Sequence, residues 1–513
     1  MGGMLYSFSL IFGSVLALLY FYIKRNDAAI TRLTPEALAF SPSRCTVKDV
    51  HARAQYLAQT PVSISKHIPP KTGRFYIVVG GVTILLPLFI IFVLRRYHQS
   101  GFLGGWIVIH LLERGEDPRK IRVLDIRLPT RSELTTGLAR DVTFLKVDVS
   151  DARAVEEAFK APWPTGGAQG PQKQVTVFHT AANIRFYERF SSQLPYSAKV
   201  NVNGTQNVID AARSIGASIM VYTSSGSVCI RNSYFWLWPW EKQPKYFVQV
   251  VDDDDRLTTK PPESFFSNYA LTKFSAEKLV RAADKSPSGN DGGLLRTGCL
   301  RPGNGVFGPG GDLSIDGYLA RKSNPSWLFT IVQSFVYVEN CSIAHLLYEQ
   351  RLLEVSQGKS NMDIGGQAFA IADPGPPPTY GDVYTTIETL TNGETYFPYL
   401  SPTVMLALAH IVELYHLIQH FFVLSIPFIG SWIPPLNSLL INLQPTIFRL
   451  TTVHLIFDDS RARLAPEKGG LGYNGACNTM EGIHLTVDHY KRSLGEKAGR
   501  SIDADIINGK PSI

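Results

Sequence analysis

Residues 75–81 (FYIVVGG) and 100–105 (SGFLGG) resemble the two halves of one nucleotide-binding loop. Between them, residues 82–99 form an 18-residue block that is mostly apolar (VTILLPLFIIFVLRRYHQ). Without it the chain would read FYIVVGGSGFLGGWIVIHLLERG: a β-branched strand, a G-G-x-G-x-x-G turn and an amphipathic helix. Glycines at such a turn let the backbone approach a pyrophosphate held at the helix N-terminus. The two halves therefore predict a dinucleotide-binding fold whose loop is interrupted.

Strands and helices are expected to alternate from Arg74 to about residue 310. Apolar, β-branched stretches predict strands at 121–126, 142–149, 175–182, 218–225 and 294–302, with helices such as 151–160 and 203–214 between them. This alternation predicts an α/β fold, a Rossmann-like doubly wound parallel sheet. We expect residues 74–310 to form the dinucleotide-binding domain, with 82–99 as an insertion. Residues 311–513 are expected to form a smaller C-terminal region that binds substrate and associates with a membrane.

The composition argues against several classes of protein. The net charge of +7 comes without a basic block interleaved with aromatic residues, so no nucleic-acid partner is expected. Five scattered cysteines form no CxxC pair, which argues for a reducing compartment and against disulfides or a zinc site. His410, Glu413, His416 and His420 fall near one helical face, but in so apolar a stretch we interpret them as a polar stripe rather than metal ligands.

The amino terminus predicts a membrane anchor. Residues 5–23 are uncharged and long enough to span a bilayer, and Lys24 and Arg25 follow at once. The positive-inside rule then places the rest of the chain in the cytosol. We expect an anchor at 1–25 and a linker at 26–73 with at most one short helix. Residues 404–429 and 432–450 are apolar but interrupted by prolines, and are expected to form buried core, to line a substrate cavity or to rest on a bilayer.

The strongest catalytic signal is Tyr269 followed four residues later by Lys273. On a helix these side chains share one face, so the ammonium is expected to lower the pKa of the phenol. Tyrosine then becomes a general acid and base for an alcohol–ketone pair. A strand ending in Thr223-Ser224-Ser225 precedes them, and Ser225 is expected to bind the substrate oxygen, with Ser224 and Ser227 as rivals.

Several ordered motifs carry a family resemblance. They are NVNGTQNVIDAA (201–212), VYTSSGSV (221–228), YALTK (269–273), RPGNGVFGPGGD (301–312) and FVYVENCSIAHLL (335–347). Together with the glycine halves they resemble extended short-chain dehydrogenases, and more narrowly the 3β-hydroxysteroid dehydrogenase family. The resemblance implies NAD-dependent oxidation of a 3β-hydroxysteroid or sterol to the 3-ketone. If C4 carries a 4α-carboxylate, the product is a β-keto acid that can lose carbon dioxide.

The resemblance also implies roles for individual residues. Tyr269 would be the base, Lys273 its partner and a ribose ligand, Ser225 the oxygen donor and Asn201 the fourth catalytic member, although a helix N-cap explains Asn201 equally well. Asp125 favours NAD, since a carboxylate there disfavours a 2′-phosphate, while Arg127 keeps NADP as the alternative. The implied cofactor-binding residues are Gly80, Gly81, Gly101, Phe102, Leu103, Gly104, Asp125, Arg127, Asp148, Ala181, Ala182, Lys273 and Pro302.

The expected setting is the endoplasmic reticulum membrane, with the catalytic domain facing the cytosol. The expected partners are a sterol or steroid, membrane lipid, and either a second copy of the chain or a sterol-biosynthesis complex. The aromatic run 234–240 (YFWLWPW) suits a sterol cavity, a membrane interface or ordinary packing. The alternative functions are a related enzyme acting on a non-sterol alcohol or ketone, and a catalytically dead membrane scaffold.

The block at 82–99 has two interpretations. It could belong to a second membrane segment over 75–94, at the expense of the first strand. We favour a retained intron, because valine codons begin with GT, a glutamine codon can be CAG, and removal of the 18 codons restores an intact loop. If it is present, the block is expected to bulge out near the pyrophosphate site.

Overall fold

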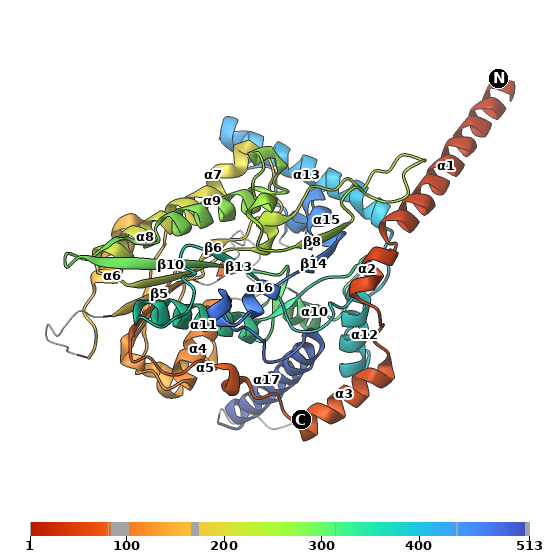
Figure 1. The fold of residues 1–513 in the computed structure, drawn as a ribbon. Helices are drawn as coiled ribbons and strands as arrows, with labels where there is room; N and C mark the ends of the chain where they lie inside the picture. The colour runs from red at the N-terminus through yellow and green to blue at the C-terminus, as the bar shows by residue number, and fades with distance from the viewer. Residues whose placement is uncertain are drawn as a thin grey trace.

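A parallel sheet forms the centre of the fold (Figure 1). The computed structural model describes residues 2–80, 82–83, 102–165, 174–312, 314–437 and 440–507. The strand order is β13-β10-β7-β5-β1-β3-β4, all in parallel pairs, and β9 (Ser286–Ser288) pairs antiparallel with β10. The parallel strands are β1 (Phe75–Val79), β3 (Ile121–Asp125), β4 (Thr143–Lys146), β5 (Val175–His179), β7 (Ile219–Thr223), β10 (Gly293–Pro302) and β13 (Ala368–Ile371).

Helices cover both faces of this sheet (Figure 1). On one face lie α4 (Phe102–Glu113) and α11 (Val338–Ser356), and on the other lie α6 (Ala152–Lys160), α8 (Gly204–Ser214) and α9 (Asn268–Ala282). Apart from the edge strand β4, the parallel strands are largely buried, which explains their apolar, β-branched sequences. The predicted strands and the predicted doubly wound α/β fold are therefore confirmed.

The remaining elements surround this domain. The helices are α1 (Gly2–Ile30), α2 (Pro35–Phe40), α3 (Val47–Gln59), α5 (Ser132–Thr135), α7 (Leu194–Ala198), α10 (Ile315–Arg321), α12 (Tyr380–Leu390), α13 (Pro402–Ser425), α14 (Pro427–Gly430), α15 (Pro445–Thr451), α16 (Ser460–Arg463) and α17 (Thr479–Ile507). The short strands are β2 (Val82–Thr83), β6 (Ala182–Asn183), β8 (Val248–Val251), β11 (Val306–Phe307), β12 (Val336–Tyr337) and β14 (His454–Phe457).

The strand order reverses at β1, which lies between β3 and β5. At such a switch point the loops leave the carboxyl ends of the strands in opposite directions and open a crevice for a ligand. Gly80, Asp125 and Thr180 stand at or directly after the carboxyl ends of these three strands. The topology alone therefore brings predicted cofactor residues together.

Residues 26–73 are more ordered than the sequence suggested. Instead of a linker with at most one short helix, they form the end of α1, then α2 and α3, whose Ala37 and Val50 are buried. Arg44 pairs with Asp382 of α12 at 3.0 Å, which fixes the start of α3 to the C-terminal region. The sequence lacked visible periodicity here because both helices are short and bury only a few side chains.

In the part of the chain that the structure describes, two apolar helices are long enough to cross a membrane by length and composition. One lies in Ser7–Phe40, where the apolar window is not buried at all, and the other is α13, where it is 28% buried. A proline does interrupt 404–429: Pro427 begins α14 just after α13 ends at Ser425, while the 24 residues of α13 form one unbroken helix. α1 projects away from the body (Figure 1).

Most of the inserted block lies outside the described residues, as do Gly81 and Gly101. Its first two residues form β2, which pairs in parallel with β6, Val82 opposite Ala182 and Thr83 opposite Asn183. The predicted bulge at 84–99 is therefore not described. After Gly80 the chain runs alongside β6, which an uninterrupted loop turning directly into α4 would not do.

Candidate active site

The predicted catalytic residues meet at the carboxyl end of β7. Ser225 directly follows this strand, and α9 begins after Ser267, whose side chain caps the helix by accepting a hydrogen bond from the Ala270 amide. Tyr269 lies in the first turn of α9, half-buried, with its phenol close to the Ser225 hydroxyl. The structure thus brings Ser225 and Tyr269 together.

Lys273 is buried one turn further along α9. Its Nζ donates a 2.6 Å hydrogen bond to the Thr223 carbonyl and lies 4.2 Å from the centre of the Tyr222 ring. Burial lowers the pKa of Lys273 to about 7 and raises the pKa of Tyr269 to about 12, the latter only partly offset by Ser225. The expected drop in the pKa of Tyr269 is therefore absent from this structure, because desolvation dominates and the ammonium is directed at Thr223.

The three candidate serines differ in their hydrogen-bond partners. Ser224 Oγ donates to Glu277 at 2.6 Å, and Glu277 is itself paired with the buried Arg301, so the Ser224 hydroxyl is engaged behind the site. Ser225 Oγ donates to Ser227 Oγ at 2.8 Å. Ser225 is the candidate that both contacts Tyr269 and faces the cavity described below.

Asn201 lies in a π-helical turn, Lys199–Asn203, between α7 and α8. Its Oδ1 accepts from the Asn183 amide at 2.7 Å, while its Nδ2 donates to the Asn183 carbonyl and to Thr272 Oγ1. The helix N-cap interpretation is therefore wrong, since the residue sits inside a continuous helical run. Asn201 ties β6 to α9, and its catalytic role stays a prediction.

A cavity of about 330 Å³ opens in front of these residues. Ser225, Tyr269 and Lys273 line it together with the predicted cofactor residues Phe102, Leu103, Ala182 and Pro302. Leu450 also lines it, in agreement with the expectation that 432–450 contributes to a substrate cavity. The sequence analysis missed the other apolar lining residues: Ile184, Phe186, Phe266, Tyr318, Phe335 and Tyr380. They come from segments that lie far apart in the sequence, so no short motif could reveal them.

A second cavity of about 140 Å³ continues from the first past Ala182, which lines both. Gly80, Asp125, Asp148 and Ala181 also line it. Asp125 Oδ1 accepts from the Arg127 amide at 3.1 Å, but its buried Oδ2 has no hydrogen-bond partner among the described residues. Burial raises the pKa of Asp125 to about 6. A ribose hydroxyl would supply the missing donor, so these residues fit the adenosine half of a dinucleotide.

Close contacts require glycine at two positions of the loop, Gly80 and Gly104, because a Cβ atom there would collide with neighbouring backbone. Gly80 has φ +96°, and a Cβ there would lie 2.1 Å from Ala181 Cα. A Cβ on Gly104 would lie 2.4 Å from the Gly80 carbonyl oxygen. Strand β1 and helix α4 therefore meet as they do in a dinucleotide-binding turn, although the residues that join them include the block.

Comparisons with known proteins settle the family. A model of the 3-beta hydroxysteroid dehydrogenase/isomerase family matches residues 99–392, more than half of the chain. The chain belongs to this family. Its members are dehydrogenases, oxidoreductases that act on a CH–OH group, and the family together with the fold indicates a nicotinamide cofactor. The match begins at the last residue of the inserted block.

Individual relatives agree with this assignment. The chain is 28% identical over 377 residues to 3beta-hydroxysteroid-dehydrogenase/decarboxylase isoform 2 of Arabidopsis thaliana, covering 72% of this chain and 56% of that protein. It is 28% identical over 407 residues to a decarboxylating sterol-4-alpha-carboxylate 3-dehydrogenase of Candida albicans, covering 77% and 96%. The human 3 beta-hydroxysteroid dehydrogenase type 7 is 32% identical over 289 residues, covering 55% and 68%.

A solved structure supports the fold alone. The UDP-glucose 4-epimerase of Thermotoga maritima aligns with a TM-score of 0.50 and 17% identity, over 82% of this chain and 99% of that one.

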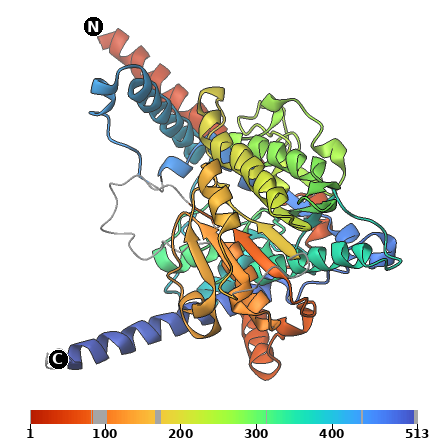
Figure 2. The ribbon, with the colours of Figure 1, turned by 90° about the vertical axis from the view of Figure 1, so that its left-hand side faces the viewer.

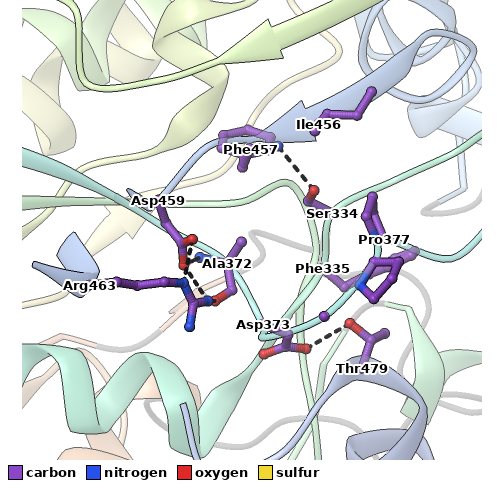
Figure 3. Close-up of a pocket in the computed structure, with 12 residues that line it drawn as sticks. Ser334, Phe335, Ala372, Asp373, Pro377, Ile456, Phe457, Asp459, Arg463 and Thr479 are labelled. Carbon is purple, nitrogen blue, oxygen red and sulfur yellow. Dashed lines mark hydrogen bonds and ion pairs between the residues drawn. The ribbon is translucent and has the colours of Figure 1, made fainter. Parts of the chain in front are cut away.

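A third cavity, of about 240 Å³, lies beyond Phe335, which lines both it and the substrate cavity (Figure 3). Its carboxylates are engaged: Asp373 accepts from Thr479 Oγ1 at 2.9 Å, and Asp459 pairs with Arg463 through two 2.7 Å bonds. These contacts connect β13, α16 and α17. They give the cavity a structural role behind the substrate wall.

Proposed function

We propose that this chain catalyses the NAD-dependent oxidation of a 3β-hydroxysterol to the 3-ketone, with decarboxylation when the substrate carries a 4α-carboxylate. The observation that carries the proposal is that Ser225, Tyr269 and Lys273 open together onto a largely apolar cavity. Such a cavity suits a flat apolar substrate with one hydroxyl at its inner end. The names of the Arabidopsis and Candida relatives favour the same reaction.

The residues of the chain would divide the work as follows. Ser225 and Tyr269 hold the substrate hydroxyl, and Tyr269 accepts its proton as the ketone forms. The bound cofactor supplies the hydride acceptor. Lys273 holds the carbonyl of Thr223 and so fixes the end of β7 that carries Ser225. The β-keto acid formed from a 4α-carboxysterol then loses carbon dioxide without a further catalytic group.

NAD is the proposed cofactor. The buried Asp125 carboxylate at the end of β3 would accept hydrogen bonds from both ribose hydroxyls and repel a 2′-phosphate. Arg127 donates only its backbone amide to Asp125 among the hydrogen bonds described, so its guanidinium keeps NADP as the alternative cofactor.

The proposed location is the endoplasmic reticulum membrane, with α1 as the anchor and the catalytic domain in the cytosol. Residues 7–21 of α1 are exposed, and Lys24 and Arg25 follow close behind. A sterol substrate partitions into lipid, so an anchored enzyme meets it at a high local concentration.

Turnover assays test the proposed function. The purified full chain, and a version lacking 82–99, are mixed with NAD and either a 4α-carboxysterol, a nucleotide sugar or a flavonoid-type ketone. We expect NADH and carbon dioxide only with the sterol, from the shortened version at least. Turnover of the nucleotide sugar or ketone instead would assign the chain to the alternative enzyme class. Inactivity of both versions on all three would favour the scaffold interpretation.

A further inference from the structure

Helix α13 departs from the usual surface polarity: its exposed face is apolar, while two polar side chains are buried with Leu406, Ala409 and Val412. Glu413 and His416 are buried, with 5% and 8% of their surface exposed, whereas Ile411, Leu414 and Phe421 are exposed by 64%, 59% and 58%. A surface helix of a soluble protein turns its apolar stripe to the core and its charged side chains outward. This departure indicates that α13 has protein on its polar side and an apolar medium on the other.

The polar side of α13 is engaged by the wall of the active site. Arg189 binds the Glu413 carboxylate through two 2.7 Å hydrogen bonds, and the ring of Tyr187 packs edge-on against His416. These residues belong to the segment 184–190, whose Ile184 and Phe186 line the substrate cavity. This segment therefore lies between the helix and the substrate cavity.

The same segment is connected to the catalytic tyrosine. The backbone amide of Asn268, the residue before Tyr269, donates to the Glu188 carbonyl at 2.8 Å, and its side chain donates to the Phe190 carbonyl at 2.8 Å. The contacts thus run from α13 through residues 184–190 to the start of α9.

The exposed face of α13 continues onto neighbouring apolar elements. After Pro427 the chain adds Phe428 and Trp432, which are 74% and 77% exposed. Helix α1 lies beside α13 (Figure 2), and Asn26 of α1 donates to Thr403 Oγ1 at the start of α13 at 2.9 Å. The exposed side of α13 is therefore next to the predicted anchor.

Aromatic and basic residues border this surface. Trp238 and Trp240 stack on each other at 5.2 Å and are 63% and 73% exposed, and neither lines a cavity described above. Lys242 and Lys245 follow, both exposed. Tryptophan and lysine prefer the headgroup level of a bilayer, so this loop fits the boundary between lipid and water.

We propose that the outer face of α13, together with α14 and Trp432, docks in one leaflet of a lipid bilayer, and that the substrate enters its cavity from that leaflet past residues 184–190. The helix docks and does not cross the bilayer, because its charged side is bound to protein. The entry route rests on the proposed sterol substrate, whereas the docking does not.

A local dye tests the docking in the full chain. Phe421→Cys is labelled with a polarity-sensitive fluorophore in a Cys45→Ser background, since the other four cysteines are buried. Leu138→Cys, 62% exposed in the turn Gly137–Asp141 beside α5, is the matched control. With phosphatidylcholine vesicles the dye at 421 should shift to the blue and be quenched by brominated lipid, while the dye at 138 should not change. An unshifted dye at 421, or a protein-concentration-dependent shift without vesicles, which indicates a second copy, would overturn the docking.

Kinetics test the entry route. We expect Ile411→Glu with Leu414→Glu to raise the apparent KM for vesicle-borne sterol by about fivefold or more, with kcat on detergent-dispersed sterol unchanged. Leu128→Glu with Leu138→Glu is the control pair, exposed by 56% and 62%. Equal KM values for the two pairs would contradict the route. If no version turns over sterol, the proposed function fails while the dye experiment still decides the docking.

Discussion

The chemistry of the site depends on one half-buried phenol. Tyr269 lies beside Ser225 and Lys273 in the wall of the substrate cavity, which Tyr318, Tyr380 and Asp312 also line. Tyr269→Phe keeps the ring and removes the hydroxyl. We expect kcat to fall by about 10²- to 10⁴-fold with the Kd for NAD unchanged. Steady-state kinetics with a fluorescence titration of NAD measure both, and near-normal kcat would contradict the assignment.

The same phenol predicts a pH profile. Because burial raises the pKa of Tyr269 to about 12, its ionised fraction rises roughly tenfold per pH unit below that value. The rate of alcohol oxidation should therefore increase from pH 7 to 9, and this increase should be lost in Tyr269→Phe. Initial rates across this range measure it, and a falling profile in the unmodified chain would contradict the role of base.

The carboxylate of Asp125 is expected to select NAD over NADP. Removing its charge in Asp125→Asn weakens the hydrogen bonds to the ribose hydroxyls and the repulsion of a 2′-phosphate. We expect the KM for NAD to rise by about tenfold or more while the KM for NADP falls. Asp148→Asn, on the same cavity but exposed, is the control and should change both constants less. If Asp125→Asn kept the same preference for NAD over NADP, Asp125 would not be the residue that selects NAD.

Lys273 is expected to support turnover while lowering the stability of the folded chain at neutral pH. Its pKa is lowered by burial from 10.5 to about 7, so the unfolded chain binds more protons than the folded one between these values. The contribution of this group to stability is present above pH 10.5 and is lost as the pH falls through 7. Lys273→Met should abolish turnover yet raise the melting temperature at pH 7, with the difference shrinking towards pH 10. A pH-independent difference would contradict the shift.

At the scale of elements, the π-helical turn between α7 and α8 joins two parts of the site. Asn201→Ala removes the hydrogen bonds to Asn183 and Thr272, and should cost about 2 kcal/mol of stability together with much of kcat. Asn203→Ala, exposed in the same turn, is the control. Thermal unfolding and turnover measure the two effects, and equal results for both variants would make the turn a simple spacer.

Sequence patterns predicted the elements whose surroundings are determined locally. The strands, the serine after β7 and the tyrosine on α9 follow from apolar runs and short spacings. The exposed apolar face of α13 could not be predicted from the sequence, because an apolar helix gives the same sequence pattern whether it is exposed or buried. The raised pKa of Tyr269 could not be predicted either, since it depends on burial by segments that are distant in the sequence. The π-helical turn at Asn201 leaves no signature that distinguishes it from an N-cap.

At the scale of the whole molecule, the inserted block leaves the parallel sheet formed but interrupts the loop that is expected to bind the cofactor. The family match begins at residue 99, while β1 precedes the block and nevertheless joins the sheet between β3 and β5. Deleting 82–99 should tighten the binding of NAD by about tenfold or more, because the turn can then close onto the pyrophosphate. Calorimetric titration of both versions measures this, and equal affinities would show that our account of the loop is wrong.

Transcript sequencing across residues 82–99 tests the intron hypothesis separately. We expect most messages to lack the block. An abundant, translated message that retains it would make the block a genuine part of the protein, and any difference in NAD affinity would then describe an isoform.

The first helix has a practical consequence for work with shortened versions of this protein. α1 runs without a break from an exposed apolar stretch into Asn26 and Asp27, which are buried and hold Phe235 and Thr403. A truncation that removes all of α1 would strip two supports from the catalytic body, so the cut belongs before Lys24. Even then the apolar side of α13 stays uncovered. Purification and crystallisation of the trimmed protein should therefore still require a detergent.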